Sequence, residues 1–172
     1  MSSLDRMQTT TLHGSCAARS GQGVLLLGAS GAGKSDLLLR LVDRGFMLVA
    51  DDRVIIEAGR ASPPPELAGI IEVRGLGLLR LPFVARVALV LVMALDDAAF
   101  LSAGPPARDE AGDRRLPRPS RHRLLGVPML RCAPFEASAA LRIEIALDCL
   151  AGRQLLMVGA LEADPPPVIS PA

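Results

Sequence analysis

The chain is poor in aromatic residues and carries almost no net charge. Its 172 residues contain no tryptophan and no tyrosine, and its four aromatic side chains are all phenylalanine. Because 50% of the residues are nonetheless hydrophobic, we expect one domain with a sizeable core of leucine, valine, isoleucine and alanine. A net charge of +1 gives no basic footprint, and the missing aromatics remove any base-stacking platform. The composition therefore predicts no nucleic-acid partner.

Paired cysteines and long apolar runs are also missing. The three cysteines, Cys16, Cys132 and Cys149, are far apart and form no CxxC pair or metal-ligand spacing. We expect reduced, partly buried thiols, as is usual in the cytoplasm, rather than a disulfide or a zinc site. The N-terminus lacks the apolar stretch of a signal peptide, and the longest apolar run, residues 87–95, is too short to span a bilayer. These absences predict a cytoplasmic protein without a membrane partner.

Apolar runs bounded by glycine and proline predict strands that alternate with helices. The expected strands are residues 9–18 (with or without a bulge), 23–28, 46–52, 53–59, 68–75, 87–95 and 126–130. The expected helices are residues 34–45, closed by Gly45, and 134–152, entered at Pro134. We expect a single catalytic domain over residues 1–161, a long mobile loop at 96–123 and a disordered tail at 162–172.

One glycine-rich octapeptide contains the only lysine of the chain. Residues 28–35, GASGAGKS, match the phosphate-binding pattern G-x-x-x-x-G-K-[ST] at each defined position, between a predicted strand and a predicted helix. Glycines let backbone N–H groups turn towards phosphate oxygens, and the helix start adds positive potential. Lysine is a compact charge that fits between β- and γ-phosphates, unlike the planar fork of arginine, and a serine hydroxyl suits Mg²⁺. The predicted nucleoside triphosphate site consists of Gly28, Ala29, Ser30, Gly31, Ala32, Gly33, Lys34 and Ser35.

Two adjacent aspartates end the strand predicted after this helix. Residues 46–52 read FMLVADD, which places Asp51 and Asp52 at the carboxyl end of the strand. Ligand chemistry gathers at the carboxyl ends of strands in an open parallel sheet, so we expect both residues near the phosphate-binding loop. A carboxylate there can hold Mg²⁺ or accept a proton from an attacking hydroxyl. Since successive strand residues point to opposite faces, the pair can divide these roles.

Several motifs together resemble the catalytic domain of bacterial HPr kinase/phosphorylase. They are TLHG at 11–14, GASGAGKSDLLLRLVDRGFMLVADDRVII at 28–56 and IIEVRGLGLL at 70–79. The resemblance is specific, because EVRGLG is not a general element of P-loop proteins. It implies an α/β P-loop domain with a mixed, mainly central β-sheet flanked by helices, related to the HPr kinase and PEP carboxykinase-like architecture.

The resemblance also implies an activity. Family members use ATP and Mg²⁺ to phosphorylate a serine of the phosphocarrier protein HPr, which regulates a bacterial phosphotransferase system, and many also remove that phosphate by phosphorolysis. By position, Asp51 is the general base, and His13 assists near the transferred phosphate. Ser35, Asp52 and Glu72 arrange the metal and the phosphates, and Arg74 neutralises developing charge. The family further implies a homo-hexamer.

Two departures from the family pattern stand out. Longer members carry an N-terminal domain, for which the 12 residues before His13 leave no room, so we expect the short form found in some proteobacteria. The later P-G-R-N-type signature is not recognisable; the nearest segment is VPMLRCAPFEAS at 127–138, and whether its Arg131 partly substitutes is left open. Because that segment belongs to the phosphorylase-associated part of the family, the sequence leaves the reverse reaction open.

The remaining charged residues allow more than one interpretation. A block of arginines is expected in a solvated loop, although it can also contact an acidic partner or nucleotide phosphates: Arg114, Arg115, Arg118, Arg121 and Arg123. His122 is expected to be a loop residue. Glu72 and Arg74 are two apart and should share one side of a strand, which suits a common ligand or a surface ion pair.

Two other functions fit the phosphate-binding loop alone. One is a small-molecule kinase in which residues 96–123 close as a lid. The other is a sensor that binds a nucleotide without transferring phosphate. The HPr kinase interpretation is preferred because the motifs from His13 to Gly77 occur in the family's order.

Overall fold

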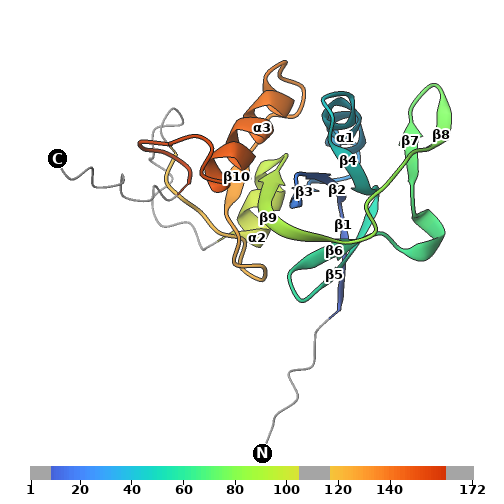
Figure 1. The fold of residues 1–172 in the computed structure, drawn as a ribbon, viewed down its shortest axis with the longest axis horizontal. Coiled ribbons are helices and arrows are strands. Elements are labelled where there is room, and N and C mark those ends of the chain that lie inside the picture. The colour runs from blue at the N-terminus through green and yellow to red at the C-terminus, as the bar shows by residue number, and fades with distance from the viewer. Residues whose placement is uncertain (1–8, 105–116, 162–172) are drawn as a thin grey trace, which may run out of the picture.

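A mixed β-sheet forms the centre of the molecule, and the computed structural model describes residues 9–104 and 117–161 (Figure 1). The strand order is β1-β5-β6-β9-β3-β2-β4, and β10 pairs with β9. The strands of this sheet are β1 (Thr10–His13), β2 (Ser15–Arg19), β3 (Gln22–Leu27), β4 (Met47–Ala50), β5 (Arg53–Glu57), β6 (Arg60–Ser62), β9 (Val87–Ala94) and β10 (Met129–Arg131). A separate hairpin pairs β7 (Ile70–Val73) with β8 (Gly77–Arg80). The helices are α1 (Lys34–Asp43), α2 (Asp97–Ala103), α3 (Ala139–Leu150) and the short 3-10 helix η1 (Pro65–Leu67).

Strand direction brings three strand ends to one edge of the sheet. β3 is parallel to β9, whereas β2 is antiparallel to both β3 and β4. β4 therefore runs in the same direction as β3 and β9, and the carboxyl ends of all three strands point to the same edge. β3 and β9 pack so closely that a Cβ added at Gly23 would lie 2.9 Å from the carbonyl oxygen of Ala88. Residues that follow these three strands are consequently neighbours.

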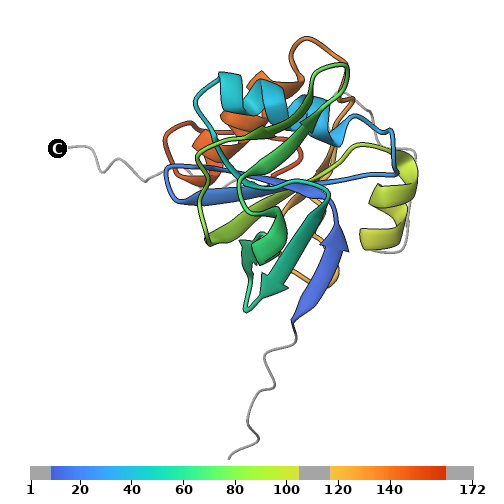
Figure 2. The ribbon, with the colours of Figure 1, turned by 90° about the vertical axis from the view of Figure 1, so that its right-hand side faces the viewer.

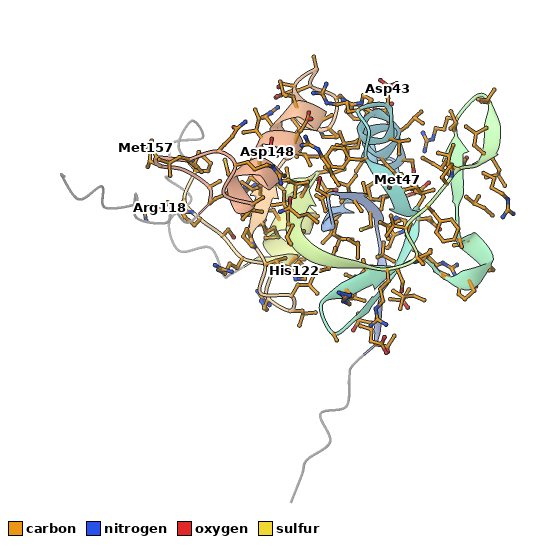
Figure 3. All side chains as sticks on the ribbon, in the orientation of Figure 1. Asp43, Met47, Arg118, His122, Asp148 and Met157 are labelled. Carbon is orange, nitrogen blue, oxygen red and sulfur yellow. The ribbon has the colours of Figure 1, made fainter. Side chains whose placement is uncertain are left out.

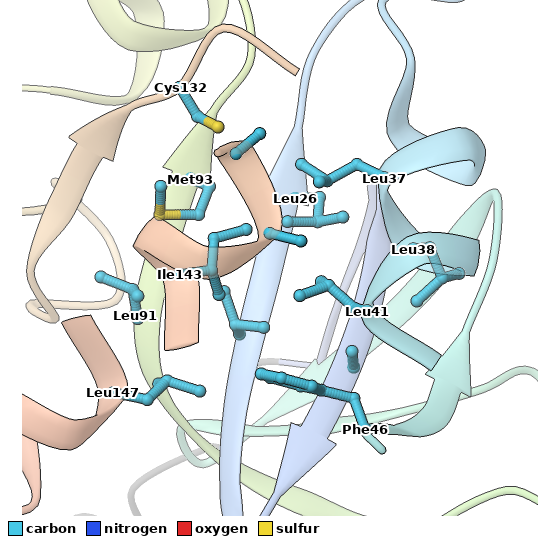
Figure 4. Packing of buried hydrophobic residues seen from close by; sticks show 14 of the residues in the cluster. Leu26, Leu37, Leu38, Leu41, Phe46, Leu91, Met93, Cys132, Ile143 and Leu147 are labelled. Atoms are coloured by element: carbon cyan, nitrogen blue, oxygen red, sulfur yellow. The ribbon is translucent and has the colours of Figure 1, made fainter. Parts of the chain in front are cut away.

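The core lies on both faces of the sheet. Alternate residues of β3 belong to different clusters: Val24 and Leu26 pack with α1 and α3, and Leu25 packs on the other face with β4, β5 and β9. Figure 4 shows leucines of α1 and Ile143 of α3 pointing towards Leu26. α1 and α3 lie on the same side of the sheet, and β1 and β5 lie at the end of the molecule away from these two helices (Figure 2). The predicted α/β domain with a mixed central sheet flanked by helices is confirmed.

Most predicted elements are present, and their ends have clear causes. α1 stops where predicted, since Arg44 is its C-cap and Gly45 follows with a φ of 91°. The predicted strand at 9–18 is divided at Gly14, where a Cβ would lie 2.8 Å from the carbonyl oxygen of Leu26. β1 consequently pairs with β5, and β2 pairs with β3 and β4.

Two predicted segments differ from the structure, one at residues 97–103 and one at the start of the last helix. Residues 96–123 were expected to form one long loop, but α2 occupies Asp97–Ala103 because the Asp96 carboxylate caps it and accepts the Ala99 N–H at 2.7 Å. α3 starts at Ala139 rather than at Pro134, because residues 133–138 form turns in which Glu136 N–H bonds Ala133 C=O. Residues 105–116 and 162–172 lie outside the described part of the chain, as do Arg114 and Arg115 and the expected tail.

The three cysteines are unpaired in the structure; Cys16 and Cys132 are buried and Cys149 is partly buried. Side chains fill the space between the helices and the sheet (Figure 3). In residues 9–104 and 117–161, no helix has the length and apolar character needed to cross a membrane.

Candidate nucleotide-binding site

The glycine-rich loop joins β3 to α1 in a conformation that only glycine adopts easily. Gly31 and Gly33 have φ values of 82° and 94°, in the left-handed region that disfavours residues with a Cβ. Within the loop, Ala32 N–H bonds Ala29 C=O at 3.0 Å, and Leu37 N–H bonds Gly33 C=O at 3.0 Å. The loop therefore has an internal turn and leads directly into the first turn of α1. The predicted strand, loop and helix occur in that order.

Lys34 points back into this loop. Its Nζ donates hydrogen bonds of 2.8 Å to the carbonyl oxygens of Gly28 and Ala29, and only 7% of the residue is exposed. Burial lowers the pKa of the Lys34 ammonium, and the carboxylates of Asp52, Asp51 and Asp96 act in the opposite direction. An ammonium that donates to two loop carbonyls, in the field of three aspartates that favour its charged form, is positioned to meet phosphate oxygens.

Asp51 and two serine hydroxyls form a buried polar cluster beside the loop. Ser35 Oγ donates to Asp51 Oδ1 at 2.9 Å, and Ser15 Oγ donates to the same oxygen at 2.7 Å. Ser15 is fully buried and Asp51 is 6% exposed. Ser15 was not predicted as a site residue, because its place beside Asp51 depends on the pairing of β2 with both β3 and β4. A hydroxyl next to a carboxylate is a donor set that suits Mg²⁺.

Asp52 and His13 form a second, exposed pair. His13 Nδ1 lies 3.3 Å from Asp52 Oδ1 and 3.1 Å from the Asp52 carbonyl oxygen, and the two side chains are 50% and 63% exposed. The two aspartates contact different partners, as expected, but strand alternation is not the cause. β4 ends at Ala50, and Asp52 has a left-handed φ of 69°, so a tight turn separates the two carboxylates.

Glu72 and Arg74 lie on the β7–β8 hairpin. Both are exposed, and no hydrogen bond or ion pair connects either residue to the loop or to Asp52. The expectation that they share one side of a strand was wrong, because β7 ends at Val73 and Arg74 belongs to the turn. Across the residues that the structure describes, no three His, Cys, Asp or Glu side chains gather as a metal site. Ser35 is hydrogen-bonded to Asp51, and the joint metal role of Ser35, Asp52 and Glu72 stays a prediction.

Asp96 is a further site residue that the sequence analysis missed. It follows β9, and its Oδ2 accepts the backbone N–H of Ala29 at 2.7 Å. Hydrogen bonds from the Ala29 and Ala99 amides hold the pKa of Asp96 below its usual range. The signal was available, since the second DD pair of the chain follows the apolar run 87–95 as the first follows 46–50.

The other candidates point away from the loop. Arg131 forms an ion pair with Asp97 and lies over the Phe100 ring, 4.0 Å from its centroid, so it is committed to α2. His122, labelled in Figure 3, is a loop residue as predicted. Its ring is nevertheless buried, and its Nδ1 accepts the Leu124 and Leu125 amides at 3.3 and 3.2 Å.

Comparisons with known proteins agree with this fold. The family model of the HPr Serine kinase C-terminal domain matches residues 5–84. The HPr kinase/phosphorylase of Bordetella petrii is 51% identical over 78 residues, which are 41% of this chain and 25% of that protein. The HPr kinase/phosphorylase of Aromatoleum aromaticum is 34% identical over 161 residues, 89% of this chain and 50% of that protein. The chain thus spans half or less of the length of these curated relatives.

A solved structure agrees on the fold. The HPr(Ser) kinase/phosphatase of Coxiella burnetii superposes with a TM-score of 0.57 and 24% identity, over 84% of this chain and 90% of that one. At this identity, the superposition shows the fold alone. The match over residues 5–84 and the similarity to the Aromatoleum protein over 89% of this chain point to the same family. The chain is related to the HPr kinase/phosphorylase family through the HPr Serine kinase C-terminal domain matched at residues 5–84.

Proposed function

We propose that this chain is an ATP- and Mg²⁺-dependent protein serine kinase whose substrate is an HPr-like phosphocarrier protein. One observation carries the proposal: the consecutive residues Lys34 and Ser35 place a buried ammonium against the loop carbonyls and a hydroxyl against the Asp51 carboxylate. Such a loop binds the phosphates of a nucleotide, and a hydroxyl–carboxylate pair holds the metal ion. The relation to this family supports a phosphocarrier as the acceptor.

The residues present fit Mg-ATP. Gly31 and Gly33 adopt the backbone conformations that turn amides towards phosphate oxygens, and Lys34 already has its ammonium inside the loop. Bound Mg-ATP supplies the phosphoryl group and neutralises its charge. The chain's own contribution is position: Lys34 exchanges its two carbonyl partners for phosphate oxygens, and Ser35 and Asp51 offer oxygen ligands.

The contacts support a division of labour between the two aspartates. The resemblance gives the base role to Asp51 and a metal role to Asp52. Asp51, however, is buried against two hydroxyls, whereas Asp52 is exposed beside His13. Our proposal therefore places Asp51 with Ser35 on the metal side, and lets Asp52 accept the proton of the incoming serine hydroxyl with His13 beside it. Glu72 and Arg74 remain proposed contributors from the β7–β8 hairpin.

The test is a phosphorylation assay with purified HPr. The chain is incubated with HPr, ATP and Mg²⁺, and transfer to one serine is identified by mass spectrometry. HPr with alanine at the acceptor serine is the substrate control, and Lys34→Ala is the enzyme control. Absence of transfer to a cognate HPr, at a protein concentration where ATP binds, refutes the kinase proposal. Transfer to metabolites but not to HPr would instead identify a small-molecule kinase.

Further arms of the same assay separate the remaining proposals. A sensor that only binds the nucleotide should keep its biological effect in Asp52→Asn and lose it in Lys34→Ala. A kinase should lose phosphate transfer in both variants. Asp51→Asn should change the dependence of phosphate transfer on the Mg²⁺ concentration more than Asp52→Asn does. Adding inorganic phosphate to phosphorylated HPr tests the reverse reaction, and light scattering tests the hexamer that the family suggests.

A further inference from the structure

Asp96 connects the phosphate-binding loop to a neighbouring helix through a single carboxylate. Oδ2 accepts the N–H of Ala29, the second residue of the loop, and Oδ1 accepts the N–H of Ala99 in the first turn of α2. Both donor–acceptor distances are 2.7 Å. The two contacts join segments that are far apart in sequence, since Ala29 and Asp96 are separated by 67 residues.

The backbone of Ala29 occupies a central place in the loop. Its N–H bonds Asp96, while its carbonyl oxygen accepts both the Lys34 ammonium at 2.8 Å and the Ala32 amide at 3.0 Å. The approach of Asp96 is close, because a Cβ added at Gly28 would lie 3.2 Å from Asp96 Oδ2. A carboxylate at Asp96 thus fixes the residue to which Lys34 donates.

α2 is in turn attached to the central sheet. Arg131 of β10 forms an ion pair with Asp97 and lies over Phe100, and β10 is paired with β9. Asp96 therefore anchors the loop to a rigid unit of helix and strands rather than to a free segment. Because Asp96 is charged over the whole neutral range, its two hydrogen bonds are charge-assisted and stronger than neutral ones.

We propose that Asp96 is a positioning residue of the nucleotide site, which holds the start of the loop in its phosphate-binding shape. This inference rests on the proposed nucleotide binding, and it adds to the site a residue that follows β9 and caps α2. Asp96 acts through Ala29 and Lys34. The alternative is that Asp96 serves only as the N-cap of α2, in which case its loss affects stability alone.

Three variants separate these roles. Asp96→Ser keeps an N-cap oxygen for Ala99, since serine caps helices about as well as aspartate, but one short hydroxyl cannot also hold Ala29. Asp96→Asn has one acceptor oxygen and presents an NH₂ group to the other amide donor. Asp97→Asn is the matched control: it makes the same change one residue later, at a carboxylate that is 75% exposed and pairs with Arg131.

Three quantities are measured for each variant: the Mg-ATP dissociation constant by calorimetry, the melting temperature, and the exchange rate of the Ala29 amide by NMR without nucleotide. We expect Asp96→Ser to melt close to the wild type, to exchange its Ala29 amide at least tenfold faster, and to bind Mg-ATP about tenfold more weakly, the lower end for a lost bond to a charged group. Asp96→Asn should show both effects plus a lower melting temperature. Asp97→Asn should match the wild type in binding and exchange.

Unchanged Mg-ATP affinity and unchanged Ala29 exchange in Asp96→Ser would overturn the positioning role. Failure of the wild type itself to bind Mg-ATP refutes the proposed function, and the Ala29 exchange rate then still decides whether Asp96 fixes the loop. A weakened affinity in Asp97→Asn equal to that in Asp96→Ser would also overturn the inference, because it would trace the effect to α2 as a whole.

Discussion

Replacing Gly33 by alanine should strain the phosphate-binding loop in two separable ways. Gly33 has a φ of 94°, so any side chain there adopts a left-handed backbone conformation. The new Cβ would also lie 2.9 Å from Cζ of Phe135 and 3.3 Å from Cγ of Pro134. Gly31 provides the matched comparison, because its φ is 82° and no atom lies within 4 Å of an added Cβ. Gly31→Ala therefore reports the backbone strain without the contact.

The expected magnitudes follow from these two terms. A left-handed conformation costs alanine about 1–2 kcal/mol, and the lost flexibility of the unfolded chain returns about 0.4–1 kcal/mol. Gly31→Ala should thus lower the free energy of unfolding by about 1 kcal/mol. Gly33→Ala adds an overpacking cost, typically about 1–3 kcal/mol. Because Phe135 is 72% exposed and its ring can move outward, we expect the low end.

Urea unfolding followed by circular dichroism measures these differences, and a double-mutant cycle isolates the contact. Phe135→Ala alone should change stability little, since the ring is mostly solvated. In the Gly33→Ala background it should restore about 1 kcal/mol, whereas in the Gly31→Ala background it should restore none. Equal costs for the two glycine variants, with no rescue by Phe135→Ala, would show that Phe135 does not pack on the loop and would refute the reasoning.

Three further predictions concern buried groups. Ser15→Ala should lower the free energy of unfolding by about 1–3 kcal/mol in urea titrations, because it removes a buried hydrogen bond to the Asp51 carboxylate; Ser102→Ala, whose hydroxyl is exposed, should cost far less. Burial lowers the pKa of His122, so the unfolded chain binds a proton at this residue more readily than the folded chain does. The free energy of unfolding should therefore decline as the pH falls below about 6.5. A His122→Gln variant should show a flatter dependence of the free energy of unfolding on pH between pH 7 and 5. Burial raises the pKa of all three cysteines, so Ellman's reagent at pH 8 should leave Cys16 unreacted in the native protein and count three thiols in denaturant; rapid native labelling of Cys16 would contradict its burial.

The local parts of the site could be predicted from the sequence. GASGAGKS has its glycines, lysine and serine in one continuous segment, and the apolar runs on either side determine that it joins a strand to a helix. Asp51 followed from a general rule about strand ends, and it does lie beside Ser35. In both cases the information is contained within a few consecutive residues and a known topology.

Contacts between distant segments could not be predicted in the same way. Ser15 reaches Asp51 across 36 residues, because Gly14 breaks the strand and turns β2 in between β3 and β4. The arrangement of Asp52 depends on a left-handed φ that no residue pattern announces. Glu72 and Arg74 carry a family motif, yet their place on a hairpin outside the central sheet is decided by which strands pair.

The strand directions explain why two aspartates from different parts of the chain support one loop. β9 and β4 run in the same direction as β3, so the residues that follow them arrive at the edge where the loop begins and ends. Asp96 then holds the amide of Ala29 at the entry, and Asp51 holds the hydroxyl of Ser35 at the exit. Ser30 and Gly31 lie between these anchors and are exposed. The two carboxylates also favour the charged form of Lys34, whose burial alone would disfavour it. A loop fixed at both ends and exposed in the middle can bind a phosphate chain without first becoming ordered, which lowers the entropic cost of binding.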